Sequence, residues 1–307
     1  MVGSSPVKPV DCTIDFDTSV LTGKTAVVTG GASGLGEAYV RALVAAGIYV
    51  CFGDLDVYRG EQLASELPRT KFVKCDVTNW ENQVQLFEQA VTLSPSGKVD
   101  FVVANAGITH QDAVFTFDAP GNEPIKPSLD IVEVNLHGTL YTAKLAMHYF
   151  VKQNGTEVSD KQEDTCLVLI GSGAAYLDCP RGPQYSATKW AMRGIMHSLR
   201  RTAFYYGSRV NMISPWYVRT KILTDTMFND VEKSGVQLAT TDDAGQALLR
   251  ILSDKTINGR SLFVSARKWA PRGYLDLDLD EYAGNALLEE IQADQVKSSP
   301  VELGLFI

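Results

Sequence analysis

The sequence lacks any apolar run of about 20 residues, the length that a membrane-spanning helix requires. Its first residues also lack a basic segment followed by an apolar one, so we expect no secretory signal peptide. Positive charge is scarce, because 28 lysines and arginines are outnumbered by 36 aspartates and glutamates, for a formal net charge of −8. This balance argues against nucleic acid or a membrane as a partner.

Cysteine and histidine are sparse, and neither shows the spacing of a metal site. The cysteines stand at positions 12, 51, 75, 166 and 179, and the histidines at positions 110, 137, 148 and 197. Because several cysteines fall in predicted strands, we expect reduced, buried thiols, no bound metal and a cytoplasmic protein. A chain of 307 residues with 45% hydrophobic content is long enough to bury one large core.

Short apolar runs alternate with helical patterns along the chain. They predict seven strands, at residues 25–29, 48–52, 71–77, 99–104, 166–170, 209–214 and 261–265. Continuous apolar strands separated by helices imply a parallel sheet that helices cover on both faces, with right-handed crossovers. The sequence therefore predicts an α/β fold, a Rossmann-type doubly wound sheet of seven parallel strands in a single domain.

Three segments are expected along the chain. Residues 1–22 are predicted to form an N-terminal arm, and residues 23–266 the dinucleotide-binding and catalytic domain. Residues 267–307 are a C-terminal extension, in which 275–280 alternates like an extended edge piece and 281–296 favours a helix.

A glycine cluster joins the first predicted strand to the first predicted helix. It reads Thr29-Gly-Gly-Ala-Ser-Gly-Leu-Gly36, and apolar residues at helical spacing follow it. Glycines permit a tight turn that a pyrophosphate can approach, and the helix N-terminus offers unpaired N–H groups. A glycine-rich turn without a ligand is the alternative, but the strand–turn–helix context favours a dinucleotide site.

An acidic residue ends the second predicted strand. Asp54 lies roughly 20 residues beyond Gly36, where a carboxylate can bind the ribose hydroxyls of a dinucleotide. A 2′-phosphate at this place would be repelled by Asp54 and Asp56, and Ser33 adds no positive charge to compensate. We therefore expect NAD rather than NADP. The alternative is that Asp54 is only an acidic residue of a turn and does not contact a cofactor.

Tyr185 and Lys189 are four residues apart, so a helix would place both side chains on one face. An isolated tyrosine titrates near pH 10, roughly three units too high for a base at neutral pH. A neighbouring ammonium favours the phenolate and lowers the pKa of the phenol. The spacing also occurs by chance in surface pairs, so its meaning depends on its surroundings.

The glycine cluster and the Tyr185-Ser-Ala-Thr-Lys189 motif together resemble the short-chain dehydrogenase/reductase family over about residues 22–266. The overall pattern is similar to fungal 15-hydroxyprostaglandin-dehydrogenase-like members of the NAD-dependent type. The resemblance implies that Tyr185 is the general acid/base and that Lys189 supports it. It further implies that Ser172 orients the substrate oxygen and that the backbone of Asn135 anchors a water leading to the lysine.

The resemblance also implies a set of residues that contact the cofactor: Gly30, Ser33, Gly34, Leu35, Gly36, Asp54, Asp76, Val77, Asn105, Ala106, Gly107, Tyr185, Lys189, Pro215, Val218 and Thr220. One position departs from the family, which usually has Pro-Gly where this chain has Pro215-Trp216. Tryptophan does not share the backbone freedom of glycine, and it adds a bulky face beside the nicotinamide. The departure puts the local geometry of the cofactor and the shape of the pocket in doubt.

Large apolar residues follow the sixth predicted strand, in a segment that folds over the substrate as a mobile lid in this family. The expected substrate pocket comprises Ala174, Tyr176, Cys179, Trp216, Tyr217, Leu223, Met227 and Phe228. Such a pocket suits a hydrophobic secondary alcohol or ketone, for example a polyketide, terpenoid, steroid or fatty-acid derivative of secondary metabolism. Ordinary packing of these side chains onto the domain is the alternative.

The sequence thus predicts an oxidoreductase that transfers a hydride between a hydrophobic secondary alcohol or ketone and NAD. Two alternatives remain, an NADPH-dependent ketone reductase and a non-catalytic NAD(H)-binding sensor. The intact Ser172, Tyr185 and Lys189 argue against the sensor, because binding alone requires no proton relay. In relatives the helices at about 129–151 and 183–205 pair across a two-fold axis, which implies a homodimer or homotetramer.

Overall fold

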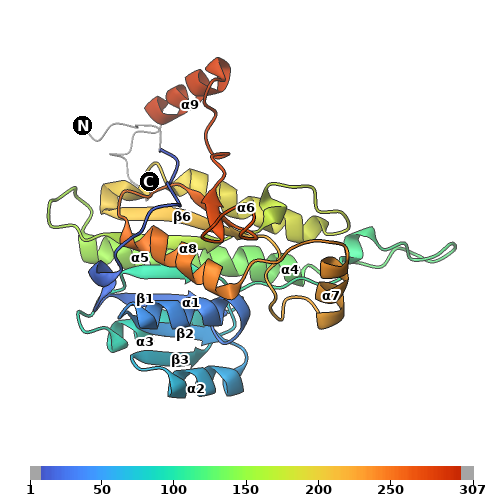
Figure 1. The fold of residues 1–307 in the computed structure, drawn as a ribbon, viewed down its shortest axis with the longest axis horizontal. Coiled ribbons are helices and arrows are strands. Elements are labelled where there is room, and N and C mark those ends of the chain that lie inside the picture. The colour runs from blue at the N-terminus through green and yellow to red at the C-terminus, as the bar shows by residue number, and fades with distance from the viewer. Residues whose placement is uncertain (1–7, 299–307) are drawn as a thin grey trace.

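The computed structural model describes residues 8–298, and a single sheet runs through it (Figure 1). The strands lie in the order β3-β2-β1-β4-β5-β6-β7-β8. Their bounds are β1 Thr25–Thr29, β2 Tyr49–Asp54, β3 Thr70–Lys74, β4 Phe101–Ala104, β5 Thr165–Ile170, β6 Ser208–Pro215, β7 Ser261–Val264 and β8 Tyr274–Asp276. The first seven pair in parallel, as expected, whereas β8 pairs antiparallel with β7. The predicted fold class is confirmed, but the sheet has eight strands rather than seven.

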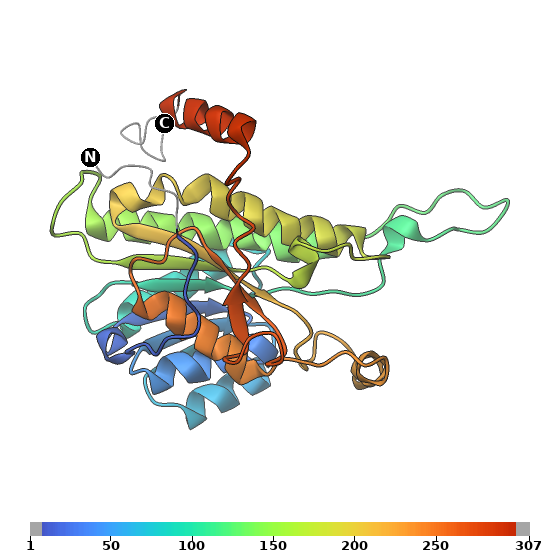
Figure 2. The ribbon, with the colours of Figure 1, turned by 45° about the horizontal axis from the view of Figure 1, so that its top comes forward.

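Helices cover both faces of this sheet. Their bounds are α1 Gly34–Ala45, α2 Val57–Glu66, α3 Trp80–Leu93, α4 Asp130–Val132, α5 Gly138–Asn154, α6 Pro183–Leu199, α7 Asp225–Lys233, α8 Thr241–Ser253 and α9 Ala286–Ser298. Helices α1, α2 and α8 pack on one face, and α3, α5 and α6 on the other (Figure 2). Short 3₁₀ turns lie at η1 Ser19–Leu21, η2 Ala113–Phe115, η4 Gly173–Ala175 and η5 Ala203–Tyr206, and a π-helical turn, η3, at Glu133–His137.

The central strands are apolar on both faces because each face meets a separate core. In β1, Ala26 and Val28 pack into the core beneath α1 and α8, while Val27 between them packs into the core beneath α3 and α5. Successive side chains of a strand point to opposite faces, so a strand covered on both sides must be apolar at every position. This is why the strands read as unbroken apolar runs in the sequence.

The strand order reverses at β1, whose two neighbours are β2 and β4. In open sheets of this kind, the loops at the carboxyl ends of the strands diverge at such a point and leave a crevice. The glycine loop follows β1 there, and the segment Asn105–Gly107 follows β4. The fold therefore positions a ligand site at this edge of the sheet.

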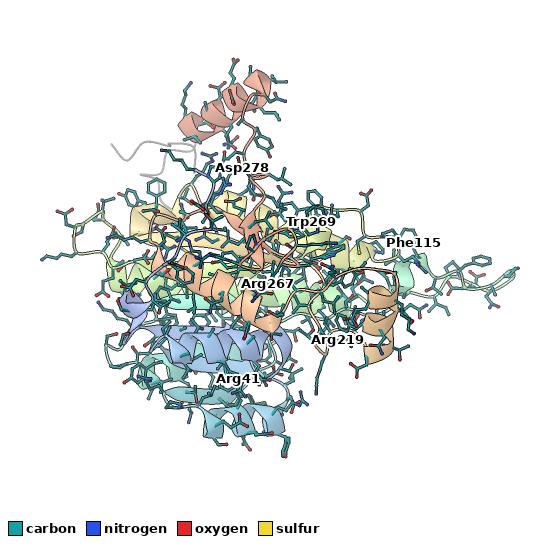
Figure 3. The ribbon with its side chains drawn as sticks, in the orientation of Figure 1. Arg41, Phe115, Arg219, Arg267, Trp269 and Asp278 are labelled. Atoms are coloured by element: carbon teal, nitrogen blue, oxygen red, sulfur yellow. The ribbon has the colours of Figure 1, made fainter. Side chains whose placement is uncertain are left out.

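Two segments stand away from the body (Figure 2). The loop between β4 and α4 projects from the carboxyl edge of the sheet, with Phe115 near its base (Figure 3). At the other extreme, α9 is displaced from the rest of the extension and, within residues 8–298, contains no buried residue. Over the same described residues, no helix is both long and apolar enough to cross a membrane.

All five cysteines fall within the described residues and are free thiols. Cys12, Cys51, Cys75 and Cys166 are buried, whereas Cys179 is exposed. The expectation of buried thiols is therefore wrong for Cys179, which lies in the loop between η4 and α6 and does not enter a strand. No group of side chains within residues 8–298 is arranged to hold a metal ion.

Candidate active site

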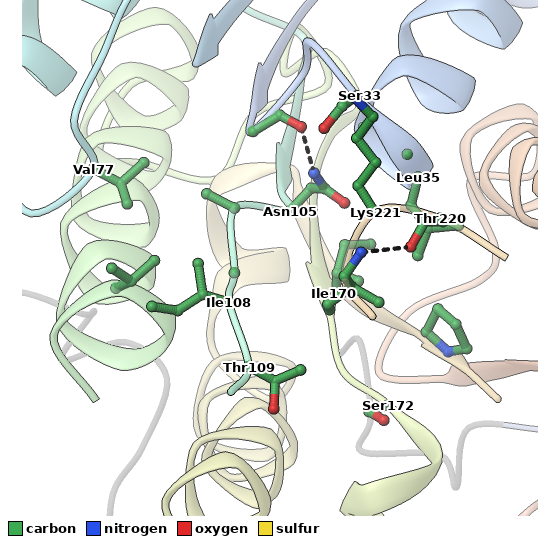
Figure 4. Close-up of a pocket in the computed structure, with 18 of the residues that line it drawn as sticks. Ser33, Leu35, Val77, Asn105, Ile108, Thr109, Ile170, Ser172, Thr220 and Lys221 are labelled. Carbon is green, nitrogen blue, oxygen red and sulfur yellow. Dashed lines mark hydrogen bonds between the residues drawn. The ribbon is translucent and has the colours of Figure 1, made fainter. Parts of the chain in front are cut away.

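A cavity of about 400 Å³ opens at the carboxyl ends of the central strands. Figure 4 shows part of its wall, from Ser33 and Asn105 to Thr220 and Ser172. The lining includes every residue that the sequence predicts at a cofactor: Gly30, Ser33, Gly34, Leu35, Gly36, Asp54, Asp76, Val77, Asn105, Ala106, Gly107, Tyr185, Lys189, Pro215, Val218 and Thr220. The structure thus brings these residues around one space, and their individual roles stay predictions.

The glycine loop is too tightly packed for side chains. A Cβ atom on Gly36 would lie 1.9 Å from the carbonyl oxygen of Gly30. Gly30 has φ +65°, a backbone conformation that L side chains rarely adopt, and a Cβ there would meet the Cα of Ala106 at 2.8 Å. The Asn105 side chain braces the turn, because its Nδ2 donates to the carbonyls of Thr29 and Gly30 at 2.9 Å each. This bare, braced backbone fits the approach of a pyrophosphate.

Asp54 lies at the end of β2, beside the glycine loop. One of its carboxylate oxygens accepts a hydrogen bond from the backbone N–H of Ala32 at 2.9 Å, and the other accepts from Asp56 at 3.0 Å. Each oxygen can accept a further bond. The carboxylate is therefore fixed in orientation and still able to accept hydrogen bonds from a ribose diol.

Three of the four predicted catalytic side chains meet at the far end of the cavity. Pro183 occupies the first turn of α6, where its missing N–H costs nothing, and the helix then carries Tyr185 and Lys189 on one face. The Lys189 Nζ lies 5.6 Å from the centre of the Tyr185 ring. Ser172, two residues beyond the end of β5, lines the same end of the cavity and lies close enough to Tyr185 to affect the pKa of its phenol.

Burial dominates the electrostatics of this end. It lowers the pKa of Lys189 to about 8, although the Nζ donates to the carbonyl of Ile170 at 3.0 Å. Burial also raises the pKa of Tyr185, and the neighbouring Ser172 hydroxyl lowers it without overcoming the effect of burial. The sequence predicts that Lys189 lowers the pKa of Tyr185, but in the protein without a ligand this pKa is raised. A positive charge brought by a ligand would shift the phenol toward ionisation.

Asn135 does not line the cavity but buttresses it. It lies in the π-helical turn η3, buried, where its Oδ1 accepts from the N–H of Ile108 at 2.8 Å. Its Nδ2 donates to the carbonyl of Ile108 at 2.9 Å, so one amide side chain holds both backbone groups of a lining residue. Such π turns occur often at functional sites, and the role predicted for the backbone of Asn135 stays a prediction.

Trp216 fits the strand without strain. Its N–H donates to the carbonyl of Val264 at 2.8 Å, which extends the pairing of β6 and β7, and its φ is not positive. The space for the indole comes from Gly173, where a Cβ atom would lie 2.3 Å from the ring. Tryptophan can therefore replace the usual glycine here because another glycine, next to Ser172, makes room for it.

Most residues predicted for a substrate pocket do not line this cavity, and their role stays a prediction. Of the eight, Trp216 lines this cavity, and Ala174, Tyr176, Cys179, Tyr217, Leu223, Met227 and Phe228 do not. Tyr176 packs inward, edge-on to Phe263. Phe228 is buried in α7, and the guanidinium of Arg219 lies 5.3 Å from the centre of its ring.

Several lining residues were missed. Most of them lie next to a recognised motif residue: Ile108 and Thr109 after Gly107, Gly171 before Ser172, and Lys221 and Ile222 after Thr220. These residues could have been predicted from their position next to the motif residues in the sequence. Leu55, Cys75, Val134 and Ile170 also line the cavity, and their apolar character alone did not separate them from core residues.

Comparisons with known proteins agree with this geometry. A family model described as short chain dehydrogenase matches residues 24–230. The chain is 34% identical to 5'-hydroxyaverantin dehydrogenase of Dothistroma septosporum, over 89% of this chain and 94% of that protein. It is 32% identical to NADP-dependent dehydrogenase M3 of a Phoma species, over 90% of this chain and 86% of that one. Among solved structures, 3-ketoacyl-(acyl-carrier-protein) reductase from Brucella melitensis complexed with NADH matches at 27% identity and a TM-score of 0.67, over 80% of this chain and 97% of that chain.

Proposed function

This chain belongs to the short-chain dehydrogenase family, and we propose from that premise that it oxidises a hydrophobic secondary alcohol, or reduces the matching ketone, with NAD(H). It is a dehydrogenase that acts on an alcohol group with a nicotinamide cofactor. The observation that carries the finer proposal is the single cavity that holds the glycine loop at one end and Ser172, Tyr185 and Lys189 at the other.

In the proposed reaction the side chains manage the proton. The Ser172 hydroxyl hydrogen-bonds the substrate oxygen and aims it at Tyr185, whose phenol gives or takes the alcohol proton. Lys189, with its pKa lowered to about 8 by burial, is still mainly protonated at neutral pH and can stabilise the phenolate. The nicotinamide, when bound, accepts or supplies the hydride.

We favour NAD over NADP. The fixed carboxylate of Asp54 suits a ribose diol and repels a 2′-phosphate, and Ser33 brings no positive charge to the loop. Lys221 also lines the cavity, and the name of the Phoma relative includes NADP, so NADPH-dependent ketone reduction is the second candidate. A non-catalytic NAD(H)-binding sensor is the third candidate, because binding alone does not require Ser172, Tyr185 and Lys189, which are all present.

The substrate class follows from the apolar wall near Ser172. Trp216 lies against Gly173, next to Ser172, and Ile108 and Ile222 also line the cavity, so an apolar alcohol can exclude water from the reacting centre. The name of the Dothistroma relative, a dehydrogenase of 5'-hydroxyaverantin, supports an alcohol of secondary metabolism, such as a polyketide or terpenoid.

We also propose a homodimer or homotetramer built through α5 and α6. A groove between these helices is lined by Leu140, Met147, Ile195 and Leu199, and Leu140 and Trp190 are about half exposed. Residues 23–266 are proposed as the catalytic domain and 267–307 as its extension, with β8 adding to the sheet. The free thiols support a cytoplasmic location.

Oxidation of a panel of apolar secondary alcohols, followed by NADH absorbance, tests the proposal. Tyr185→Phe keeps the ring but removes the proton carrier, and should lower kcat by about 100-fold or more with NADH affinity nearly unchanged. Tyr205→Phe, a matched change outside the cavity, should retain full activity. Near-normal turnover by Tyr185→Phe would show that the proton-transfer assignment is wrong.

A further inference from the structure

The helix that carries the proton relay continues into a second polar stripe. Arg193 and His197 follow Tyr185 and Lys189 at intervals of four residues, so all four lie along one side of α6. Both meet the carboxylate of Asp280, from the C-terminal extension. Its Oδ1 accepts from the Arg193 Nε at 3.0 Å and lies 3.1 Å from the His197 Nε2.

Asp280 is buried as an ion. Its side chain is 2% exposed, and burial would raise its pKa, but the hydrogen bond with His197 and the charge of Arg193 hold the pKa below its usual value. A buried carboxylate is costly unless it is paired. Arg200 secures the same segment, because its Nη2 donates to the carbonyl of Asp280 at 2.9 Å. The extension is thus fastened to α6 at a defined point.

Arg193 connects this point to the active site. Its Nη1 donates to the carbonyl of Ala175 at 3.3 Å, and its Nη2 to the carbonyl of Leu279 at 2.9 Å. The guanidinium also lies over the ring of Tyr176, 4.4 Å from the ring centre. Ala175 and Tyr176 belong to the end of the 3₁₀ turn η4, whose N-cap is Ser172.

The turn is held from the opposite side as well. The Ser172 hydroxyl accepts from the N–H of Ala174 at 3.2 Å, so the side chain follows any movement of the turn. Gly173 lies against Trp216, which bounds the cavity. The turn therefore sits between the indole on the cavity side and the guanidinium on the side of the extension.

We propose that Asp280 is a positioning residue, which sets the place of the Ser172 hydroxyl through Arg193 and the turn η4. The inference rests on the function proposed above and extends it, by assigning to the C-terminal extension a part in turnover. Without Asp280, Arg193 loses its buried counter-charge and the turn loses its fixed neighbour. A misplacement of about 1 Å can cost on the order of 100-fold in rate, so a small shift of Ser172 is enough to be measured.

Asp280→Ala tests the inference, assayed well below its melting temperature. We expect kcat to fall by about tenfold or more while NADH affinity changes by less than about twofold, because the glycine loop is remote from the turn. Asp280→Glu, which restores the charge, should recover part of the rate. Asp294→Ala is the matched control, since it removes an acid of the same extension that pairs with Lys297 at 3.2 Å in an exposed position. It should leave kcat unchanged.

A double-mutant cycle with Ser172→Ala separates positioning from anchoring. If Asp280 acts through Ser172, its removal should lower kcat by less than about twofold once the hydroxyl is gone. Full additivity, or a normal kcat in folded Asp280→Ala, would overturn the inference. A normal kcat in Ser172→Ala alone would instead contradict the proposed function, so the two failures are distinguishable.

Discussion

The two ends of the cavity are built on different principles. At the glycine loop the fit depends on backbone: a Cβ at position 36 would overlap the carbonyl of Gly30, and Asn105 braces the turn through main-chain oxygens. At the opposite end the wall consists of side chains from distant segments, such as Trp216 against Gly173. A site built from backbone contacts accepts few amino-acid replacements. A wall of side chains can differ between related enzymes that act on different substrates.

Gly36→Ala should produce the largest effect, because it breaks the backbone end. The added methyl overlaps the carbonyl of Gly30, and such overpacking costs roughly 1–3 kcal/mol or more. If this cost falls on the NADH-binding conformation of the loop, affinity for NADH should drop by about 5- to 150-fold. Fluorescence titration with NADH measures it, with circular dichroism to check folding. Gly194→Ala, where the new Cβ meets nothing within 4 Å, is the control. Equal NADH affinity in both variants would contradict the difference between the two ends.

Lys189→Met probes a buried charge at the side-chain end of the cavity. Burial lowers the pKa of Lys189 to about 8, so between pH 8 and the ordinary value near 10.5 the unfolded chain binds the extra proton. Lys189 therefore destabilises the fold at neutral pH, and this cost fades as pH rises through that window. The variant should lose activity yet unfold with a free energy higher by about 1–2 kcal/mol at pH 7.

Urea unfolding at pH 7 and pH 10 measures this effect. The advantage of Lys189→Met over the unaltered chain should shrink at the higher pH. Lys233→Met, at a lysine that is 78% exposed, should show no such trend. A pH-independent difference at position 189 would show that the loss of the hydrogen bond to Ile170, rather than the buried charge, determines the result.

Asp54→Ala sharpens the comparison of the two ends, because Asp54 contributes through its side chain at the end that is otherwise built from backbone. The unaltered chain should bind NADH at least about tenfold more tightly than NADPH, since a charge-assisted contact is worth about 1.4 kcal/mol or more. The variant should lose most of this preference. Asp56→Ala, at the exposed neighbour that caps α2, should keep most of the preference, because Asp56 can repel a 2′-phosphate but does not line the cavity. Equal affinities of the unaltered chain for the two cofactors would favour the NADPH-dependent alternative.

Trp216→Gly should have the smallest effect and should change selectivity more than rate. Removing the indole removes an apolar contact beside Ser172 that only a bulky alcohol can reach. The kcat/KM for a bulky apolar alcohol should therefore fall relative to that for a small one by several-fold, the effect of an apolar contact of about 1 kcal/mol. NADH affinity should stay constant. Trp269→Gly, at a 72% exposed indole away from the cavity, is the control. An unchanged ratio of the two kcat/KM values would show that Trp216 does not contact the substrate.

The sequence predicted the backbone end more fully than the side-chain end, for physical reasons. A strand, a glycine turn and a helix are local patterns, so Gly30, Gly36 and Asp54 could be placed from their neighbours alone. The surroundings of Tyr176 could not be predicted in this way, because they depend on Arg193 and Phe263, which are distant in the chain.

The eighth strand shows the same limit. It spans Tyr274–Asp276, too short for a clear pattern, and its place depends on Arg260. That guanidinium is fully buried and binds Asp276 at 2.7 Å, a pairing between segments that no local rule indicates. The extended character of 275–280 was recognised, but its pairing with β7 was not.

The contact between Gly173 and Trp216 has an evolutionary consequence. The indole fills the space that a Cβ at position 173 would occupy, so the two positions cannot vary independently. Related chains that carry tryptophan at position 216 should keep glycine at 173, while chains with glycine at 216 are free to carry alanine or a larger residue there. The order of change is then constrained: in an ancestor without the indole, glycine at 173 must have been present before tryptophan could be accepted.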